Sequence, residues 1–233
     1  MKKILIIGGN SGIGEALATS LMANGDEVHL ALRSVDELSP QLIGNVASVQ
    51  SFQAEEECAL DLPDSLDGVV YCPGTINLKP FHRFTLSEMK KDMDVNVFGA
   101  VGVIQKALPS LKKSGRASVV LFSSVAAQTG LAMHGSISLS KGAVEGLTVA
   151  LAAELAPAKI RVNAVAPSLT DTPLAEFIVG SDTRKAAASD RHPLKCIGTA
   201  KGAAKLVEYL LSDDSAFITG QVMKVDGGLS SLR

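Results

Sequence analysis

The glycines after the first apolar run have the spacing of a turn that binds phosphate. Residues 7–21 read IGGNSGIGEALATSL, so Gly8, Gly12 and Gly14 follow the pattern G-x-x-x-G-x-G. The run ILII precedes them and an amphipathic segment follows, which places the glycines between a strand and a helix. Glycine permits a tight turn and lets a pyrophosphate approach the unpaired N–H groups at a helix N-terminus. A plain strand–helix turn can also contain glycines, but this setting favours nucleotide binding.

Arg33 stands directly after the second apolar run, EVHLAL at residues 27–32. A carboxylate at this place would accept hydrogen bonds from the ribose diol of an adenosine, whereas an arginine can pair with a 2′-phosphate. The next acidic residue along the chain is Asp36. The pattern therefore favours NADP(H) over NAD(H), and the alternative is a solvated surface arginine.

Lys141 lies in HGSISLSKGAVEG, residues 134–146, among the small and apolar residues of a predicted helix. A lysine is costly to bury unless its charge has a use. One turn earlier, Ile137 carries no group on which that charge could act. His134 lies seven residues before Lys141, and its ordinary pKa of about 6.5 suits proton transfer around neutrality. His134 is thus a candidate proton donor; the alternative, which we prefer, is a loop histidine at the rim of a cleft.

The elements that must position these residues alternate along the chain. Apolar runs predict strands at residues 4–7, 27–32, 46–52, 68–72, 117–123, 160–166 and 221–226. Helical patterns follow the first run and recur near residues 85–113, 136–156 and 200–212. Continuous apolar strands separated by helices indicate a parallel sheet covered on both faces, a doubly wound α/β (Rossmann) fold. Ligands bind such a fold at the carboxyl ends of its strands. We expect one domain over residues 1–233.

Composition excludes several other classes. The formal net charge of −2, without a long basic run, argues against nucleic acid or an anionic membrane as the main partner. Cys58, Cys72 and Cys196 are far apart, so we expect neither a metal site nor a disulfide framework. The opening MKKILIIGG has too short an apolar run for a signal peptide, and no other run is long enough for a membrane span. We therefore expect a soluble, cytoplasmic protein.

Taken in order, these motifs resemble those of the short-chain dehydrogenase/reductase family over nearly the whole chain. The family's TGxxxGIG appears as IGGNSGIG (7–14), and its NNAG appears as YCPG (71–74), where only Gly74 matches. Further segments that resemble the family are DVNVFGA (94–100), LFSSVAAQTG (121–130), RVNAVAPSLTDTPL (161–174) and FITGQVMKVDGGL (217–229).

This resemblance implies roles for particular side chains. It implies that Asn96 supports an active-site water and that Ser124 donates a hydrogen bond to the substrate oxygen. It implies that Lys141 binds the nicotinamide ribose. The residues that it places around the cofactor are Gly8, Asn10, Ser11, Gly12, Ile13, Gly14, Arg33, Gly74, Asn96, Lys141, Pro167, Thr170 and Thr172. Ser168 replaces a usual glycine.

The chain departs from the family at its proton donor. The motif YxxxK aligns with Ile137 to Lys141, so the tyrosine is absent, and the two tyrosines of the chain, Tyr71 and Tyr209, lie in other elements. Tyr71 is predicted to be an aromatic of the core or of the cofactor cleft. Loss of a positioned general acid typically costs about 10²–10⁴-fold in rate. His134 has the interval to lysine seen for the tyrosine of related enoyl reductases, although the GIG pattern kept here departs from those enzymes.

Two functions follow as hypotheses. The first is an NADP(H)-dependent oxidoreductase that reduces a carbonyl or another activated double bond of a small molecule, with water or His134 as the proton source. The second is an NADPH-binding pseudoenzyme that regulates a partner. The resemblance also implies a homodimer or homotetramer built on the helices near residues 98–113 and 136–156.

Three further expectations concern local structure. Asp92 and Asp94 are predicted to lie on the solvated side of the helix that leads to Asn96. Residues 55–57, three glutamates, are predicted to begin an exposed helix. Residues 172–198, which shape the substrate pocket in the family, are too mixed in pattern to indicate a substrate.

Overall fold

Seven parallel strands form the centre of the molecule. The computed structural model describes residues 1–232, apart from the side chain of Glu37. The strands are β1 (Lys3–Ile7), β2 (Glu27–Leu32), β3 (Ser48–Ser51), β4 (Gly68–Tyr71), β5 (Ser118–Phe122), β6 (Arg161–Pro167) and β9 (Val222–Val225). Their order in the sheet is β3-β2-β1-β4-β5-β6-β9, and every neighbouring pair is parallel. This confirms the predicted doubly wound sheet.

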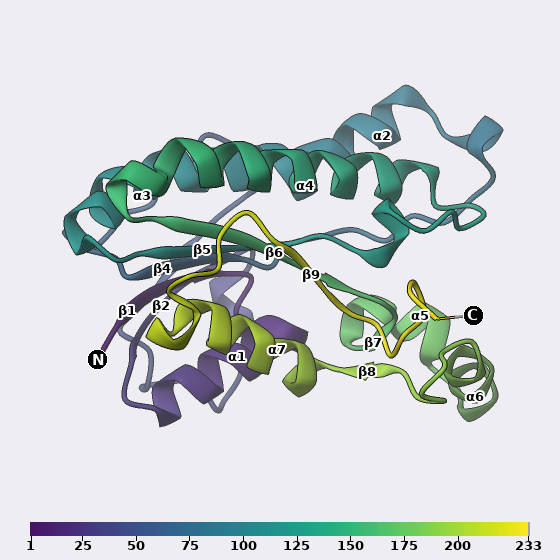
Figure 1. Ribbon diagram of the computed structural model, residues 1–233. Helices are drawn as coiled ribbons and strands as arrows, with labels where there is room; N and C mark the ends of the chain where they lie inside the picture. The colour runs from purple at the N-terminus through teal and green to yellow at the C-terminus, as the bar shows by residue number, and fades with distance from the viewer. Residues whose placement is uncertain (233) are drawn as a thin grey trace.

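Helices cover both faces of this sheet, as Figure 1 shows. On one face lie α2 (Leu86–Met93), α3 (Gly99–Ser114) and α4 (Gly135–Leu155), and on the other lie α1 (Gly12–Ala23) and α7 (Ala200–Leu211). Because side chains alternate along a strand, Leu5 and Ile7 enter the first apolar layer while Ile4 and Ile6 enter the second. Each such buried side chain contributes about 1.5–3 kcal/mol to folding. The burial of both faces explains why the strands are apolar throughout.

A π-helical turn interrupts the helix predicted over residues 85–113. The helix α2 begins with the expected capping box between Thr85 and Glu88, and the π turn then spans Asp94–Phe98 before α3 continues. The Tyr71 hydroxyl donates a hydrogen bond of 2.7 Å to the carbonyl oxygen of Val95 inside this turn. Such wider turns often occur at functional sites, and this one carries Asn96.

Two of the local expectations are wrong. Asp92 is only 1% exposed, because its carboxylate accepts hydrogen bonds from Thr75 Oγ1 at 2.7 Å, from Asn77 Nδ2 at 2.7 Å and from the Ser136 hydroxyl. A buried carboxylate is tolerated when its oxygens are paired in this way. Residues 55–57 lie in turn and irregular structure, and no helix forms between β3 and β4 in the described chain.

Residues 172–198, whose sequence pattern is too mixed to indicate a substrate, fold into short elements beyond the carboxyl ends of the strands (Figure 1). Strand β7 (Thr170–Asp171) pairs with β8 (Gly198–Thr199), and between them lie α5 (Glu176–Val179) and α6 (Asp182–Asp190). A small apolar cluster, which includes Val179, Ala188 and Ile197, holds these pieces together.

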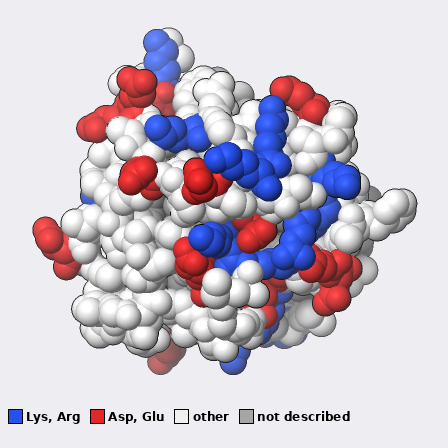
Figure 2. All heavy atoms as spheres, turned by 90° about the vertical axis from the view of Figure 1, so that its left-hand side faces the viewer, with Lys and Arg blue, Asp and Glu red and all other residues white. Residues whose placement is uncertain are grey.

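The opposite edge of the molecule, at the N-terminus, carries charges of both signs. Figure 2 shows Lys and Arg interspersed with Asp and Glu on this face. The ion pairs there include Lys2 with Asp213 at 2.8 Å and Lys113 with Asp64 at 3.0 Å. Pairs of this exposed kind contribute at most about 1 kcal/mol each.

None of the helices within residues 1–232 combines the length and apolar character needed to cross a membrane.

Candidate functional site

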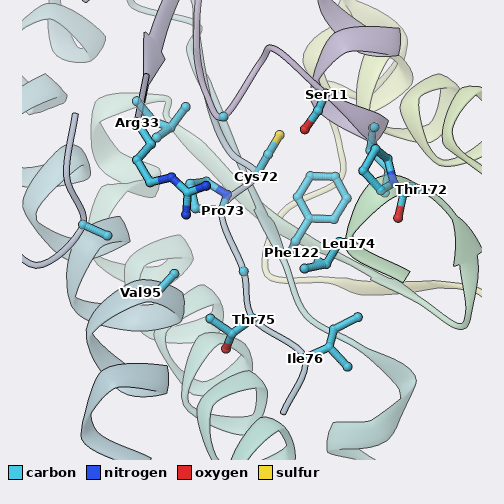
Figure 3. Close-up of a pocket in the computed structure, with 18 of the residues that line it drawn as sticks. Ser11, Arg33, Cys72, Pro73, Thr75, Ile76, Val95, Phe122, Thr172 and Leu174 are labelled. Carbon is cyan, nitrogen blue, oxygen red and sulfur yellow. The ribbon is translucent and has the colours of Figure 1, made fainter. Parts of the chain in front are cut away.

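A cleft of about 630 Å³ opens at the carboxyl ends of the strands, where the doubly wound fold predicts it. Figure 3 shows the segments that meet there, with Arg33 on one side and Ser11 and Thr172 on the other. Of the residues predicted to bind the cofactor, all but Asn96 line this cleft. A cleft of this size suits a small-molecule ligand.

The glycine turn between β1 and α1 has the conformation that its residues require. Gly8 and Gly12 have φ angles of +74° and +55°, in the region that favours glycine. A Cβ at Gly14 would lie 2.3 Å from the carbonyl oxygen of Gly8, so only a glycine lets the helix approach the strand this closely. Ser11 is the N-cap residue, and its hydroxyl makes no capping hydrogen bond. The helix N-terminus and this hydroxyl are therefore open to an anion.

Arg33 follows β2 and extends its exposed side chain into the cleft (Figure 3). Its backbone carbonyl accepts a hydrogen bond of 3.2 Å from Gln53 Nε2, which ties it to the segment after β3. No carboxylate of the described residues lies within 4.0 Å of its guanidinium group. The guanidinium is therefore available to pair with an anionic ligand.

Ser124 follows β5 and caps a short 3₁₀ turn. Its Oγ accepts a hydrogen bond of 3.2 Å from the N–H of Ala126, which leaves its hydrogen free to be donated into the cleft. The neighbouring Ser123 donates to Glu145 Oε1 at 2.7 Å, and Gln128 Nε2 donates to Glu145 Oε2 at 2.8 Å. Glu145 on α4 thus fixes the turn on both sides of Ser124.

Lys141 is buried on α4 and 6% exposed, yet it lines the cleft. Burial lowers the pKa of its ammonium group to about 8, and the neighbouring Cys72 opposes this shift only weakly. Burial also raises the pKa of the Cys72 thiol to about 12, so this thiol keeps its proton at neutral pH. Ile137, one turn before Lys141, is 5% exposed and contributes an apolar patch to the same cleft.

Asn96 lies behind the cleft wall rather than on it. Its Nδ2 donates to Thr75 Oγ1 at 2.8 Å and to the carbonyl oxygen of Asp92 at 2.7 Å. Its Oδ1 is buried and has no hydrogen-bond partner within the described chain. This oxygen lies beside Gly74, as does Lys141 Nζ.

Tyr71 belongs to the core. It is 2% exposed and packs edge-on against Phe52 with ring centroids 6.3 Å apart. Burial raises the pKa of its hydroxyl, which is already engaged with Val95. Tyr71 therefore does not offer a proton to the cleft.

His134 is the N-cap residue of α4 and does not line the cleft. Its Nδ1 lies 2.7 Å from the carbonyl oxygen of Ala132, so this nitrogen carries the proton. Two helical turns, about 10 Å, separate it from Lys141 along the helix axis. The alternative of a rim histidine is therefore the better supported one.

We expect His134→Ala to leave NADPH-dependent turnover within about twofold of the wild type, since a group outside the cleft cannot reach the reacting atoms. Steady-state kcat with a carbonyl acceptor is the measurement. A loss of about 10²-fold or more with unchanged NADPH affinity would instead make His134 the proton donor.

Sequence reasoning missed several residues that the fold brings to the site. Thr75 lines the cleft and links Asn96 to Asp92 through its hydroxyl. His192 is 2% exposed; its Nδ1 lies 2.9 Å from the carbonyl oxygen of Ala188 and its Nε2 lies 2.9 Å from Ser168 Oγ. No motif marks these positions, because each acts through partners that are distant in sequence.

The loop after β6 closes over the glycine turn. Pro167, Thr170 and Thr172 all line the cleft, and a Cβ at Gly12 would lie 3.4 Å from the Cβ of Thr172. Among the described residues, no group of His, Cys, Asp or Glu side chains is arranged to hold a metal ion.

Comparison with known proteins agrees with this architecture. A family model described as enoyl-(acyl carrier protein) reductase matches residues 7–230. A tropinone reductase homolog of Arabidopsis thaliana is 34% identical over 242 residues, which cover 97% of this chain and 89% of the relative. The chain belongs to the short-chain dehydrogenase/reductase family.

Solved structures of short-chain dehydrogenases/reductases share its fold. A short-chain type dehydrogenase/reductase from Mycobacterium ulcerans superposes with a TM-score of 0.89 at 29% identity, over 100% of this chain and 90% of that chain. A tyrosine-to-phenylalanine variant of ElxO with NADPH bound gives a TM-score of 0.88 at 27% identity, over 99% of this chain and 100% of ElxO. The family is one of oxidoreductases, which supports an enzyme of that class.

Proposed function

We propose that this short-chain dehydrogenase/reductase is an NADP(H)-dependent reductase of a carbonyl or another activated double bond. The observation that carries the proposal is the hydroxyl of Ser124, whose oxygen is engaged by Ala126 while its hydrogen remains free in the cleft. A fixed donor of this kind stabilises the negative charge that develops on an acceptor oxygen.

The cleft residues fit a nicotinamide dinucleotide phosphate. The close approach at Gly14 leaves no room for a Cβ but opens the helix N-terminus to a pyrophosphate. Arg33, which has no carboxylate partner among the described residues, would hold the 2′-phosphate. Lys141 would hold the nicotinamide ribose. When bound, the reduced nicotinamide supplies a hydride to the acceptor carbon.

The remaining roles fall to the chain itself. Ser124 donates a hydrogen bond to the acceptor oxygen and polarises the double bond. Asn96, which donates hydrogen bonds to Thr75 and Asp92, lies near the ammonium group of Lys141 and supports that part of the site. The sequence left the proton source open between water and His134, and the position of His134 outside the cleft favours a source other than this histidine.

We also propose that residues 1–233 act as one cofactor-binding domain and assemble as a homodimer or homotetramer through α3 and α4. Large apolar side chains stay exposed on this layer of the single chain, among them Phe98 at 57%, Leu139 at 54% and Val149 at 56%. Patches of this kind are typical of protein–protein contacts. Light scattering of the purified chain tests the assembly.

Titration with NADPH and NADH, followed by turnover with quinones, diketones and enones, tests the proposed function. We expect NADPH to bind more tightly than NADH and to be oxidised by at least one acceptor class. Binding without turnover would support the nucleotide-binding regulator instead. Failure to bind either nucleotide would contradict both functions.

We expect Arg33→Ala to weaken NADPH binding by about 10–100-fold and to leave NADH binding nearly unchanged. Charge-assisted hydrogen bonds are worth about 1.5–3 kcal/mol, and 1.4 kcal/mol corresponds to tenfold in Kd. Arg116→Ala, which lies before β5 at the amino ends of the strands and so away from the cleft, is the matched control. Equal losses for NADPH and NADH would show that Arg33 does not contact a 2′-phosphate.

A further inference from the structure

The side chain of Asn96 is held in one orientation. Both hydrogen-bond acceptors on its Nδ2 side, Thr75 Oγ1 and the carbonyl oxygen of Asp92, would face a carbonyl oxygen if the amide were flipped. Thr75 donates its own hydroxyl hydrogen to Asp92 Oδ1 at 2.7 Å, so it can only accept from Asn96. The Oδ1 of Asn96 is therefore fixed as an acceptor that points away from this network, with no partner among the described residues.

Because Gly74 has no side chain, both this oxygen and the ammonium group of Lys141 can lie close to its backbone. A Cβ at Gly74 would lie 3.2 Å from Asn96 Oδ1 and 3.4 Å from Lys141 Nζ. The backbone of Gly74 is not among the residues with positive φ, so the requirement is for space and not for conformation. A buried acceptor without a partner and a buried ammonium group thus lie on the same side of Gly74 without a hydrogen bond between them, and the dipole of the acceptor favours the charged form of the lysine.

Other charges around Lys141 are few. Cys72 approaches it from the end of β4, and its thiol is neutral at pH 7 because burial raises its pKa to about 12. Asp92 faces α4 through Ser136, and Glu145, on α4 itself, is occupied by Ser123 and Gln128. Lys141 therefore has no carboxylate counter-ion among the described residues, and burial lowers its pKa to about 8. An acid of this strength is close to the optimum for proton transfer near neutral pH.

The other titratable groups of the cleft lie far from Ser124. They are Arg33, Glu55 and Lys91. Ser124 follows β5, whereas Arg33 follows β2, three strands away in the sheet, or about 14 Å at the usual strand spacing. Glu55 follows β3, one strand further. Lys91 lies one turn before Val95, which Figure 3 shows on the same side of the cleft as Arg33.

We propose that Lys141 is itself the proton donor of this chain, with the unpartnered Asn96 Oδ1 beside Gly74 as a dipole that favours its ammonium form between turnovers. This rests on the proposed reduction. As the acceptor carbon gains a hydride from the reduced nicotinamide, the carbonyl π electrons move to the oxygen at Ser124. An N–H bond of the Lys141 ammonium breaks and an O–H bond forms, so the products are an alcohol and a neutral lysine. Solvent in the cleft then returns one proton to Nζ.

The proposal fixes the sign of the pH dependence. Because the donor must be protonated, the rate of reduction falls as the pH rises through the pKa of Lys141 and is highest below it. A phenol donor of ordinary pKa, about 10, would keep its proton through that range.

The test combines a measurement on the free chain with one on turnover. NMR of the chain labelled with ¹³C at the lysine ε carbon, without nucleotide, is expected to show one lysine that titrates near pH 8, because Lys141 is the only buried lysine among the described residues. The kcat of carbonyl reduction, which reports the loaded complex, is expected to fall as the pH rises through the pKa of Lys141 in that complex. If every lysine signal titrates near 10, or if kcat stays constant from pH 7 to 9.5, the proposal is wrong.

Lys141→Arg separates proton donation from charge. The guanidinium keeps a cation and N–H donors for a ribose but does not release a proton at these pH values. We expect NADPH affinity within about tenfold of the wild type and kcat lower by about 10²–10⁴-fold. Turnover within threefold of the wild type would overturn the proposal. Failure of the wild type to bind NADPH would refute the proposed function instead. If Lys141→Arg does not fold, the NMR titration and the pH profile of the wild type still test the proposal.

Discussion

Replacing Ile137 with tyrosine is expected to raise kcat for carbonyl reduction by about 10²-fold. Ile137 lines the cleft one turn before Lys141, so a phenol at this position would share the helix face of the ammonium group. A positioned general acid is worth about 10²–10⁴-fold, and the lower end applies because Lys141 already supplies a proton under our proposal. The nearby ammonium charge would also lower the pKa of the new phenol.

Ile137→Phe is the matched control, because it adds the ring without the hydroxyl. Both variants fill the same 5%-exposed position, so any cost of the larger ring is shared between them. The comparison is made at saturating NADPH after Kd has been measured for each variant. A tyrosine variant that is no faster than the phenylalanine variant would mean that position 137 does not face the reacting oxygen.

Gly14→Ala is expected to weaken NADPH binding by about 10–100-fold. The added Cβ would lie 2.3 Å from the backbone oxygen of Gly8, and neither atom belongs to a flexible side chain that could move aside. The turn must open, which displaces the N–H groups at the start of α1 and costs about 1–3 kcal/mol of stability. If binding must restore the original turn, a cost of about 2 kcal/mol lowers the affinity for NADPH by more than tenfold.

Gly146→Ala is the control for this change. It lies in the interior of α4, where an added Cβ meets nothing within 4 Å. Alanine there is expected to raise the free energy of unfolding by about 0.4–1 kcal/mol. Isothermal titration of NADPH and thermal unfolding of both variants provide the comparison. NADPH affinity of Gly14→Ala within threefold of the wild type would contradict the assignment of this turn to the pyrophosphate.

The strands and the cleft edge could be predicted from the sequence because they depend on local patterns. The apolar runs at residues 4–7 and 27–32 correspond to β1 and β2, and the glycines between β1 and α1 permit the positive φ angles that the turn requires. Arg33 reaches the cleft simply because it follows the carboxyl end of β2.

The environment of Asn96 could not be predicted in this way. Its π turn depends on Tyr71, whose hydroxyl binds Val95, and on Gly99, where a Cβ would lie 2.2 Å from that hydroxyl. Asp92 was expected to be solvated because most aspartates are. The three hydrogen-bond donors to Asp92 come from Thr75, Asn77 and Ser136. The periodicity of one helix cannot indicate contacts with segments this distant in sequence.

The part of the cleft formed by the segment between β6 and α7 was the least predictable. Strand β7 pairs with β8 across an intervening stretch that includes α5 and α6, and His192 reaches Ser168 from beyond α6. These contacts hold together elements that are each too short to show a hydrophobic period.

The position of β9 at the edge of the sheet has a consequence for the synthesis of the chain. β1, β2 and β3 can pair as soon as they leave the ribosome, but β6 receives its second neighbour only when residues 222–225 have been made. Until then the apolar residues of β6, from Val162 to Ala166, lie on an open strand edge. Such an edge templates pairing with other chains and favours aggregation. Translation that stops shortly before Val222 would therefore yield aggregating chains and not a slightly smaller enzyme.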